Sequence, residues 1–188
     1  MIFDADAYWR SMGKWLAGPG AMTPEHKVAE ERLSVVLAGI DDDVVDVLDV
    51  GCGRGRLATL LRDVLPLARY YGVDVGPDQV QATAEARPDG TIVLSRIQDF
   101  APGRKWDLVL CSEVLMHIPP ADIEAVASVL LGLTRRYLLM IEWVPEPAEL
   151  LQPIAPENWP HDYEGLFGPF AHVERLSRQN LMLVKRDG

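Results

Sequence analysis

The sequence lacks the features that define several classes of protein. Its 188 residues include only two cysteines, Cys52 and Cys111, which are too few for a disulfide scaffold and have no metal-ligand spacing. No apolar run approaches the roughly 18 residues of a membrane-spanning helix. The N-terminus carries Asp4 and Asp6 and lacks the basic and apolar regions of a secretory signal. We therefore expect a cytoplasmic protein with free thiols, no metal site and no membrane segment.

Positive charge is also scarce. Lysine and arginine number 18 against 28 aspartate and glutamate residues, which gives a formal net charge of −10. Proteins that bind a nucleic-acid backbone present a basic face to it, and the arginines of this chain are dispersed rather than clustered. The charge balance argues against DNA or RNA as a partner, although a local basic patch would still allow such binding.

Residues 44–56 (VVDVLDVGCGRGR) have the pattern of a buried strand, a glycine turn and the start of a helix. The β-branched run suits a parallel strand covered on both faces. Gly51, Gly53 and Gly55 permit positive φ angles and a close approach of the backbone to a ligand. Asp49 lies near the strand end, where a charge needs a partner or a use. Because such a turn directs backbone N–H groups at its ligand, we predict a nucleotide-like ligand here.

Strand and helix patterns alternate along the rest of the chain. This alternation predicts an α/β sheet with helices on both faces, and the length of the chain predicts one domain. An antiparallel pair is expected to close the sheet. The expected strands after the first cover residues 69–75, 91–94, 106–111, 136–144, 170–176 and 180–185, and the expected helices cover 78–87, 119–131 and 161–167.

Two helices are expected before the sheet. Tyr8, Met12, Trp15 and Leu16 share one helical stripe, and Thr23 is placed to cap a second helix that ends near residue 39. The sequence leaves two interpretations of the first helix open. Its aromatic stripe either packs on the core or forms a lid over the ligand.

Polar residues and glycine stand at the ends of the predicted parallel strands. Asp74 lies about 19 residues beyond Gly55, where an acidic side chain accepts hydrogen bonds from ribose hydroxyls. The carboxyl ends of parallel strands meet at one edge of the sheet, and ligands bind there. We therefore expect one site built from several strands. The residues that we place at this edge are Asp49, Gly51, Asp74, Asp99, Ser112 and Glu113.

Over residues 44–144 the chain resembles the class I methyltransferases that use S-adenosylmethionine. VLDVGCGRGRLA resembles their glycine-rich motif, YYGVDVGPDQV the ribose motif, RIQDF the adenine-edge motif, and WDLVLCSEVLMHIPP the fourth strand with its loop. The resemblance implies a doubly wound, mostly parallel seven-stranded sheet in the order 3-2-1-4-5-7-6, with the last strand antiparallel. We expect a single domain over 1–188, with a helical lid or cap at 1–40, a cofactor-binding core at 44–144, and an acceptor loop and closing hairpin at 145–188; the resemblance covers only the core.

The resemblance also implies roles for individual residues. Asp49 is expected to hold the ammonium of S-adenosylmethionine, Asp74 to accept the ribose hydroxyls, and Asp99 to accept from the adenine amino group. The glycines would face the methionine part of this cationic cofactor, whose demethylated product is S-adenosylhomocysteine. The full set of implied cofactor-binding residues is Asp49, Gly51, Cys52, Gly53, Gly55, Asp74, Val75, Gln98, Asp99, Phe100, Cys111 and Ser112.

Catalytic residues are harder to predict, because methyl transfer depends mainly on the alignment of the acceptor with the sulfonium methyl. His117 is a candidate base, or it shapes its loop through a local hydrogen bond. Glu142 is a candidate base or a ligand for a cationic acceptor, or it pairs with an arginine. His161 begins the His161-Asp162-Tyr163 segment, which is a candidate acceptor wall, and Asp162 is alternatively a helix N-cap.

Two further functions remain open. A nicotinamide-dependent oxidoreductase is disfavoured because Arg56 stands where the last glycine of G-x-G-x-x-G belongs. No residue in the sequence excludes the second function, that of a non-catalytic subunit that binds S-adenosylmethionine. The CSEV segment departs from the N/D-P-P-Y/F pattern of DNA adenine methyltransferases, and no Pro-Cys dipeptide supplies a cytosine-type nucleophile. A small-molecule acceptor is the leading hypothesis, with transfer to oxygen, nitrogen or carbon left open.

Overall fold

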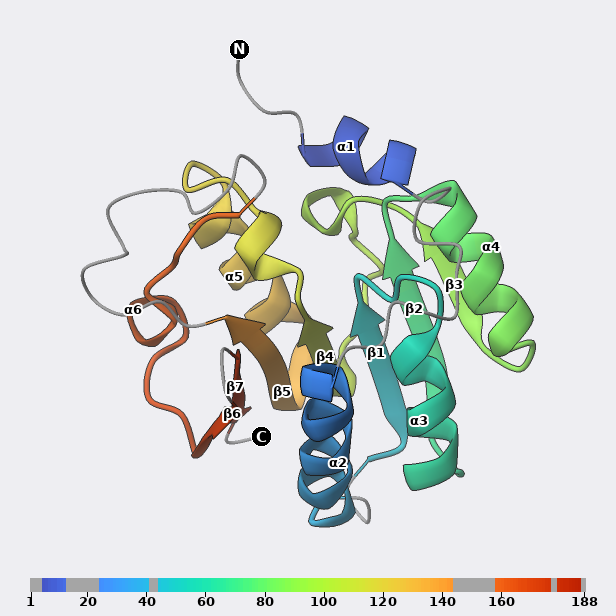
Figure 1. The fold of residues 1–188 in the computed structure, drawn as a ribbon, viewed down its shortest axis with the longest axis horizontal. Helices are drawn as coiled ribbons and strands as arrows, with labels where there is room; N and C mark the ends of the chain where they lie inside the picture. The colour runs from blue at the N-terminus through green and yellow to red at the C-terminus, as the bar shows by residue number, and fades with distance from the viewer. Residues whose placement is uncertain (1–4, 13–23, 41–43, 144–157, 177–178, 187–188) are drawn as a thin grey trace.

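The computed structural model describes residues 5–12, 24–40, 44–143, 158–176 and 179–186 (Figure 1). Its strands form one seven-stranded sheet in the order β3-β2-β1-β4-β5-β7-β6. Neighbouring strands are parallel, except that β7 is antiparallel to both β5 and β6. The predicted sheet order and its antiparallel closing strand are therefore confirmed. The strands are β1 (Asp46–Val50), β2 (Arg69–Asp74), β3 (Thr91–Leu94), β4 (Trp106–Ser112), β5 (Thr134–Trp143), β6 (His172–Leu176) and β7 (Gln179–Lys185).

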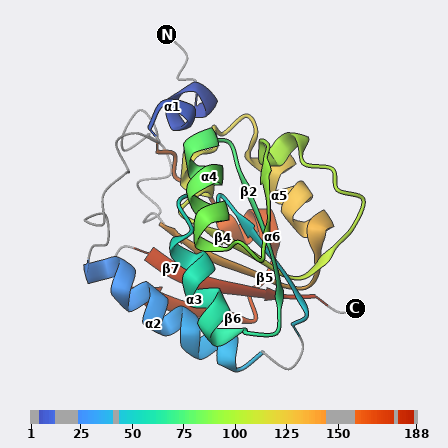
Figure 2. The ribbon, with the colours of Figure 1, turned by 90° about the vertical axis from the view of Figure 1, so that its right-hand side faces the viewer.

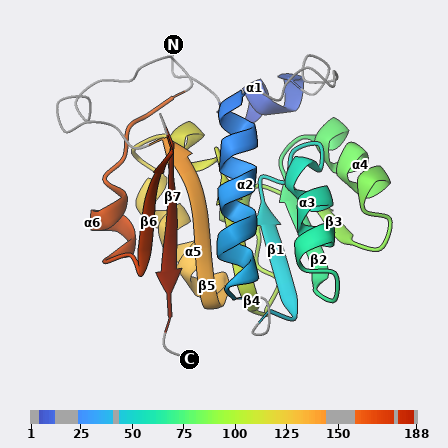
Figure 3. The ribbon, with the colours of Figure 1, turned by 60° about the horizontal axis from the view of Figure 1, so that its bottom comes forward.

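Helices cover both faces of the sheet (Figure 3). The side chains of β1 alternate between the two layers: Leu48 and Val50 pack with α5 and α6, whereas Val47 packs with α2 and α3. The helices are α1 (Ala5–Met12), α2 (Pro24–Ala38), α3 (Arg56–Val64), α4 (Pro77–Ala86), α5 (Ile123–Leu133) and α6 (Tyr163–Phe167), with short 3₁₀ turns η3 (Ile97–Asp99) and η4 (Leu115–His117).

The element boundaries differ from the predicted ones by a few residues. The helix expected from residue 119 begins at Ile123, and the one expected from residue 161 begins at Tyr163. Asp162 caps the latter by accepting a hydrogen bond from the Gly165 N–H at 3.0 Å, so the N-cap interpretation is confirmed. Thr23, Trp15 and most of the proline-rich segment 145–160 lie outside the described residues.

The helix α1 lies over the edge of the sheet where the parallel strands end, close to the first turn of α4 (Figures 1 and 2). A hydrogen bond of 3.1 Å from Gln79 Nε2 of α4 to the backbone carbonyl of Trp9 joins the two helices. The first helix therefore covers the predicted ligand edge.

Acidic residues at the opposite edge have structural partners. Asp107 Oδ2 accepts hydrogen bonds from the N–H groups of Val45 and Asp46, each at 3.1 Å. Asp46 pairs with Arg69 at 2.7 Å and Arg104 at 2.8 Å. These contacts fix how β1, β2 and β4 begin and leave the carboxyl ends of the strands for a ligand.

Candidate cofactor-binding site

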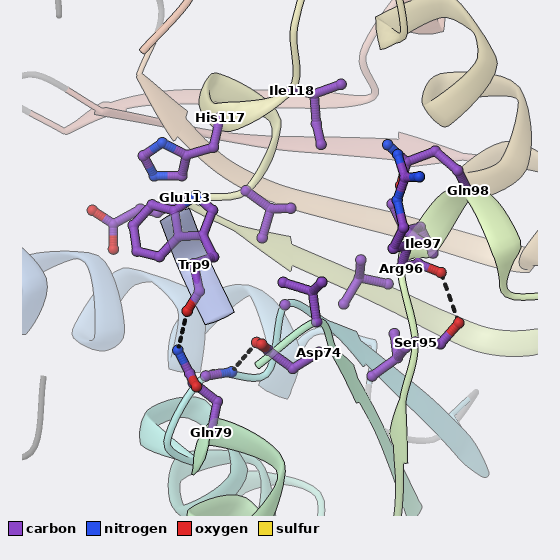
Figure 4. A pocket seen from close by; sticks show the side chains of 16 residues that line it. Trp9, Asp74, Gln79, Ser95, Arg96, Ile97, Gln98, Glu113, His117 and Ile118 are labelled. Atoms are coloured by element: carbon purple, nitrogen blue, oxygen red, sulfur yellow. Dashed lines mark hydrogen bonds between the residues drawn. The ribbon is translucent and has the colours of Figure 1, made fainter. Parts of the chain in front are cut away.

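A pocket lies at the carboxyl ends of β1 to β4, at the edge predicted from the sequence (Figure 4). Each of these strands contributes residues at or just beyond its end, and α1 and α4 contribute one residue each. The lining residues are Trp9, Val50, Gly51, Gly53, Val73, Asp74, Val75, Gln79, Ser95, Arg96, Ile97, Gln98, Glu113, Val114, His117 and Ile118. Gly51, Gly53, Asp74, Val75, Gln98 and His117 were among the predicted site residues.

The glycines of the turn meet different structural needs. Gly51 has a φ of +68°, and a Cβ there would lie 2.3 Å from Val114 Cγ2. This glycine therefore allows the loop after β4 to close against the turn. A Cβ on Gly55 would lie 3.1 Å from Ala86 Cβ, so Gly55 lets α3 approach α4. Gly55 is outside the pocket lining, and the expected contact of its backbone with the ligand stays a prediction.

Asp74 ties β2 to the glycine turn. Its Oδ2 accepts a hydrogen bond from the Gly53 N–H at 2.9 Å, and its Oδ1 accepts one from the Gly76 N–H at 2.8 Å. Burial raises the pKa of Asp74, and the two N–H groups oppose that rise. The carboxylate thus holds the turn in shape while lining the pocket.

The segment after β3 differs from the prediction. Ser95, Arg96 and Ile97 line the pocket with Gln98, whereas the Asp99 side chain is 67% exposed and approaches Arg96 Nε at 4.0 Å. Phe100 instead stacks on Trp106 in the core, with ring centroids 5.9 Å apart. Neither Asp99 nor Phe100 is part of the pocket lining, and their contacts with adenine stay predictions. Asp99 is the last residue of the 3₁₀ turn η3, whose first two residues line the pocket. The end of β3 at Leu94 was the sequence signal for Ser95.

Asp49 is buried beside the site without lining it. The hydroxyl of Tyr70 donates a hydrogen bond to Asp49 Oδ2 at 2.8 Å, and burial raises the Asp49 pKa to about 7. Tyr70 supplies the partner that a buried carboxylate requires, and the expected role of Asp49 toward the ammonium, directly or through a water molecule, stays a prediction.

Cys52, Cys111 and Ser112 also lie outside the pocket lining. The two cysteines are buried, and burial raises the pKa of each thiol. Ser112 accepts a hydrogen bond from an Arg56 guanidinium nitrogen at 3.4 Å. The placement of these three residues at the cofactor stays a prediction.

The loop after β4 brings His117 into the pocket. The His117 ring lies against the indole of Trp9 from α1, with centroids 4.4 Å apart (Figure 4). Glu113 begins this loop with a φ of +56°, which is uncommon for a residue other than glycine. Its carboxylate contacts Arg56 at 3.3 Å and His26 at 3.2 Å. The position of Glu113 after a predicted strand indicated that it lies at this edge, but no pattern indicated its backbone conformation.

Two polar atoms at the contact of α1 with the pocket have no hydrogen-bond partner within the described part of the chain. They are the indole Nε1 of Trp9 and the side-chain oxygen of Gln79. Burying an unpaired donor or acceptor costs about 1–3 kcal/mol. Because both residues line the pocket, a bound polar ligand is a natural source of the missing partners.

Glu142 and His161 lie behind the loop rather than in the pocket. Both are buried, with exposures of 0% and 6%. The Glu142 carboxylate binds backbone N–H groups of the loop, so the alternative of an arginine partner does not describe its contacts. His161 Nε2 is 2.9 Å from the carbonyl oxygen of Ile118, and burial lowers the His161 pKa. In the structure both side chains support this loop, and their contact with an acceptor stays a prediction.

Metal ligands and membrane helices were also sought in the described ranges. No group of three or more histidine, cysteine, aspartate or glutamate side chains there is arranged to hold a metal ion. No helix within the same ranges has the length and apolar character needed to cross a membrane.

Comparisons with known proteins agree with this geometry. Residues 47–136 match the family model described as a methyltransferase domain. Trans-aconitate 2-methyltransferase of Enterobacter sp. (strain 638) is 36% identical over 78 residues, which are 42% of this chain and 31% of the relative. The chain thus spans about a third of the length of that relative. The ubiquinone biosynthesis O-methyltransferase of Xanthomonas axonopodis pv. citri is 28% identical over 200 residues, covering 98% of this chain and 82% of the relative.

Solved structures share the fold over almost the whole chain. Magnesium protoporphyrin IX methyltransferase from Synechocystis PCC 6803, with bound S-adenosylmethionine, superposes with a TM-score of 0.73 at 20% identity and covers 98% of both chains. The N-methyltransferase NodS from Bradyrhizobium japonicum WM9, in complex with S-adenosylhomocysteine, gives a TM-score of 0.75 at 12% identity and covers 98% of this chain and 100% of NodS. At these identities the likeness establishes the fold.

Proposed function

Because the chain belongs to the class I S-adenosylmethionine-dependent methyltransferase family, we propose that it transfers a methyl group from S-adenosylmethionine to a small-molecule acceptor. The observation that carries this proposal is Asp74 bound to Gly53 inside a pocket at the strand ends. The relatives are named for trans-aconitate, ubiquinone biosynthesis and magnesium protoporphyrin IX, which supports a small acceptor. With two buried free thiols and no binding role for them, we also propose a cytoplasmic location.

The residues of the pocket fit the proposed cofactor. The Asp74 carboxylate is an acceptor suited to ribose hydroxyls, and Val75, Ile97 and Ile118 offer apolar contact to an adenine ring. Gly51 and Gly53 line the same pocket, and their lack of a side chain lets a ligand approach the backbone closely. When bound, S-adenosylmethionine supplies a methyl group on a cationic sulfonium. The chain holds and orients this donor and excludes water from it.

His117 is our candidate for the proton-handling group. It lines the pocket at the loop after β4, where the parallel-strand edge would present an acceptor. As a base it would accept a proton from the acceptor, and as a structural group it would only maintain the contact with Trp9. His117→Ala separates these roles. A loss of turnover at unchanged cofactor affinity supports the base, and unchanged turnover refutes it.

We further propose that α1 is a lid on this pocket. Trp9 forms part of the pocket wall, touches His117 and accepts a hydrogen bond from Gln79 through its carbonyl. The unpaired indole N–H of Trp9 and side-chain oxygen of Gln79 favour a closed state completed by ligand.

Calorimetry and an activity assay test the proposed function. The protein should bind S-adenosylmethionine and S-adenosylhomocysteine more tightly than NAD, and tighter binding of NAD would refute the proposal in favour of an oxidoreductase. Incubation with methyl-labelled S-adenosylmethionine and pools of small metabolites should then give a labelled product. Cofactor binding without any product would favour the alternative of a non-catalytic subunit.

A further inference from the structure

A buried carboxylate organises the loop that follows β4. Glu142, near the end of β5, accepts hydrogen bonds through Oε1 from the N–H groups of Val114 at 2.9 Å and Leu115 at 3.0 Å. Its Oε2 accepts one from the Met116 N–H at 3.4 Å. Three consecutive backbone donors therefore converge on one side chain.

The backbone conformation explains this convergence. The Glu113 N–H still bonds the carbonyl of Ile141 in β5 at 2.9 Å, and the positive φ of Glu113 then turns the chain sharply. Consecutive N–H groups in left-handed and right-handed helical conformations form a concave anion-binding nest. Here the carboxyl group of a side chain of the same protein occupies the nest. A left-handed conformation is strained in a residue other than glycine, and the bonds to Glu142 offset that strain.

The surroundings of Glu142 are unfavourable for a charged side chain, apart from its hydrogen bonds to the loop. The side chain is fully buried, and the charged neighbour that acts on it, Glu113, is also acidic. Burial raises the Glu142 pKa to about 8, while the three N–H groups oppose that rise. The thiol of Cys111 adds a weak contact, with its Sγ 3.8 Å from Oε1. An apolar residue would avoid this cost of desolvation but would leave three buried donors unpaired.

We propose that Glu142 is a positioning residue that fixes the β4–η4 loop and so places His117 and Val114 at the pocket. This inference rests on the proposed function only for its link to methyl transfer, because the contacts themselves concern the loop. Val114 lies on Gly51 and His117 lies on Trp9, so the loop held by Glu142 joins the glycine turn to α1. A shift of the loop would therefore disturb both walls of the pocket.

Because the two carboxylate oxygens of Glu142 bind different N–H groups, we expect different effects from substitution by glutamine and by leucine. Glu142→Gln keeps one acceptor oxygen for Val114 and Leu115 and turns an N–H group toward the Met116 N–H. Glu142→Leu removes every acceptor. Residue-resolved hydrogen exchange by NMR should therefore show faster exchange, by roughly tenfold or more, at Met116 alone in the first variant and at all three amides in the second. Leu183→Ala, in β7 on the other face of the sheet, is the matched control for loss of core packing.

A spectroscopic readout reports on His117 itself. The ring current of Trp9 changes the NMR chemical shifts of the carbon-bound imidazole protons of His117 while the two rings are in contact. This change in chemical shift should shrink in Glu142→Leu and persist in Leu183→Ala. Affinity for S-adenosylhomocysteine, measured by calorimetry, should fall about 5- to 20-fold in Glu142→Leu and remain within about twofold in Leu183→Ala. A change of stability without these signatures would mark Glu142 as a core residue only.

The outcomes separate this inference from the proposed function. If the wild-type protein binds no S-adenosylhomocysteine, the proposed function fails while the exchange pattern still decides the role of Glu142. If Glu142→Leu does not fold, the selective effect of Glu142→Gln at Met116 carries the test. Unchanged exchange at residues 114–116 together with an unchanged His117 spectrum in a folded variant would overturn the inference.

Discussion

Asp74 offers the sharpest test of how the site is built. Its carboxylate makes two hydrogen bonds to backbone N–H groups, with Gly53 at 2.9 Å and Gly76 at 2.8 Å, inside the proposed ribose end of the pocket. Asp74→Ala removes both acceptors, and Asp74→Asn replaces one of them with a donor. Both variants should therefore loosen the glycine turn and weaken cofactor binding.

The magnitude follows from these contacts. Each hydrogen bond to a charged group contributes about 1.5–3 kcal/mol. Burial of the carboxylate, which raises its pKa, offsets part of that gain, so we expect each variant to lose about 1–3 kcal/mol of folding free energy. The loss of the ribose acceptor should cost a similar amount of binding free energy, which corresponds to a dissociation constant about 5- to 150-fold larger.

The assay combines urea unfolding with calorimetric titration of S-adenosylhomocysteine. Asp63→Asn, an exposed carboxylate on α3, is the control and should change neither quantity. If Asp74→Asn retained both wild-type stability and wild-type affinity, the proposed role of this carboxylate at the junction of turn and ligand would be refuted. A loss of stability with full affinity would retain the structural role and remove the ribose contact.

Three further predictions concern the glycine turn, pH and the lid. Gly51→Ala should lower the free energy of unfolding by about 2–4 kcal/mol, because its Cβ would meet Val114 at 2.3 Å in a left-handed backbone; Val114→Ala should partly restore stability in urea titrations, and additive losses would argue against the clash. Asp49 has a pKa raised by burial from 3.8 to about 7, so the folded protein keeps a proton that the unfolded chain loses, and its contribution to stability is full below about pH 4 and is lost as the pH rises to 7. Urea titrations of the ligand-free protein between about pH 5 and pH 7 give the free energy of unfolding as a function of pH. The slope of this plot should be less negative by roughly 1.4 kcal/mol per pH unit in Asp49→Asn than in wild type, while Glu142 contributes an effect of the same sign in both proteins. Equal slopes would contradict the raised pKa. Hydrogen exchange of α1 should slow on addition of S-adenosylhomocysteine, and Trp9→Ala should abolish most of that slowing; exchange that does not respond to ligand would argue against a lid.

The sequence by itself determined the order of the elements and the centre of the site. Periodic patterns are local, so they revealed each strand of the sheet, and the glycine turn and Asp74 followed from short motifs whose backbone demands are local as well. The rule that parallel strands end at one edge then placed Gly51, Asp74 and Glu113 near one another, and the structure brings these residues to one pocket.

Only the tertiary structure decided which neighbouring side chains reach the pocket. Ser95 and Arg96, before the 3₁₀ turn η3, line the pocket, whereas the side chain of Asp99 at the end of that turn is 67% exposed. The fit of Val114 on Gly51 and the hold of Glu142 on the same loop join residues distant in sequence. Such contacts depend on the packing of several elements at once, and no local pattern in the chain encodes them.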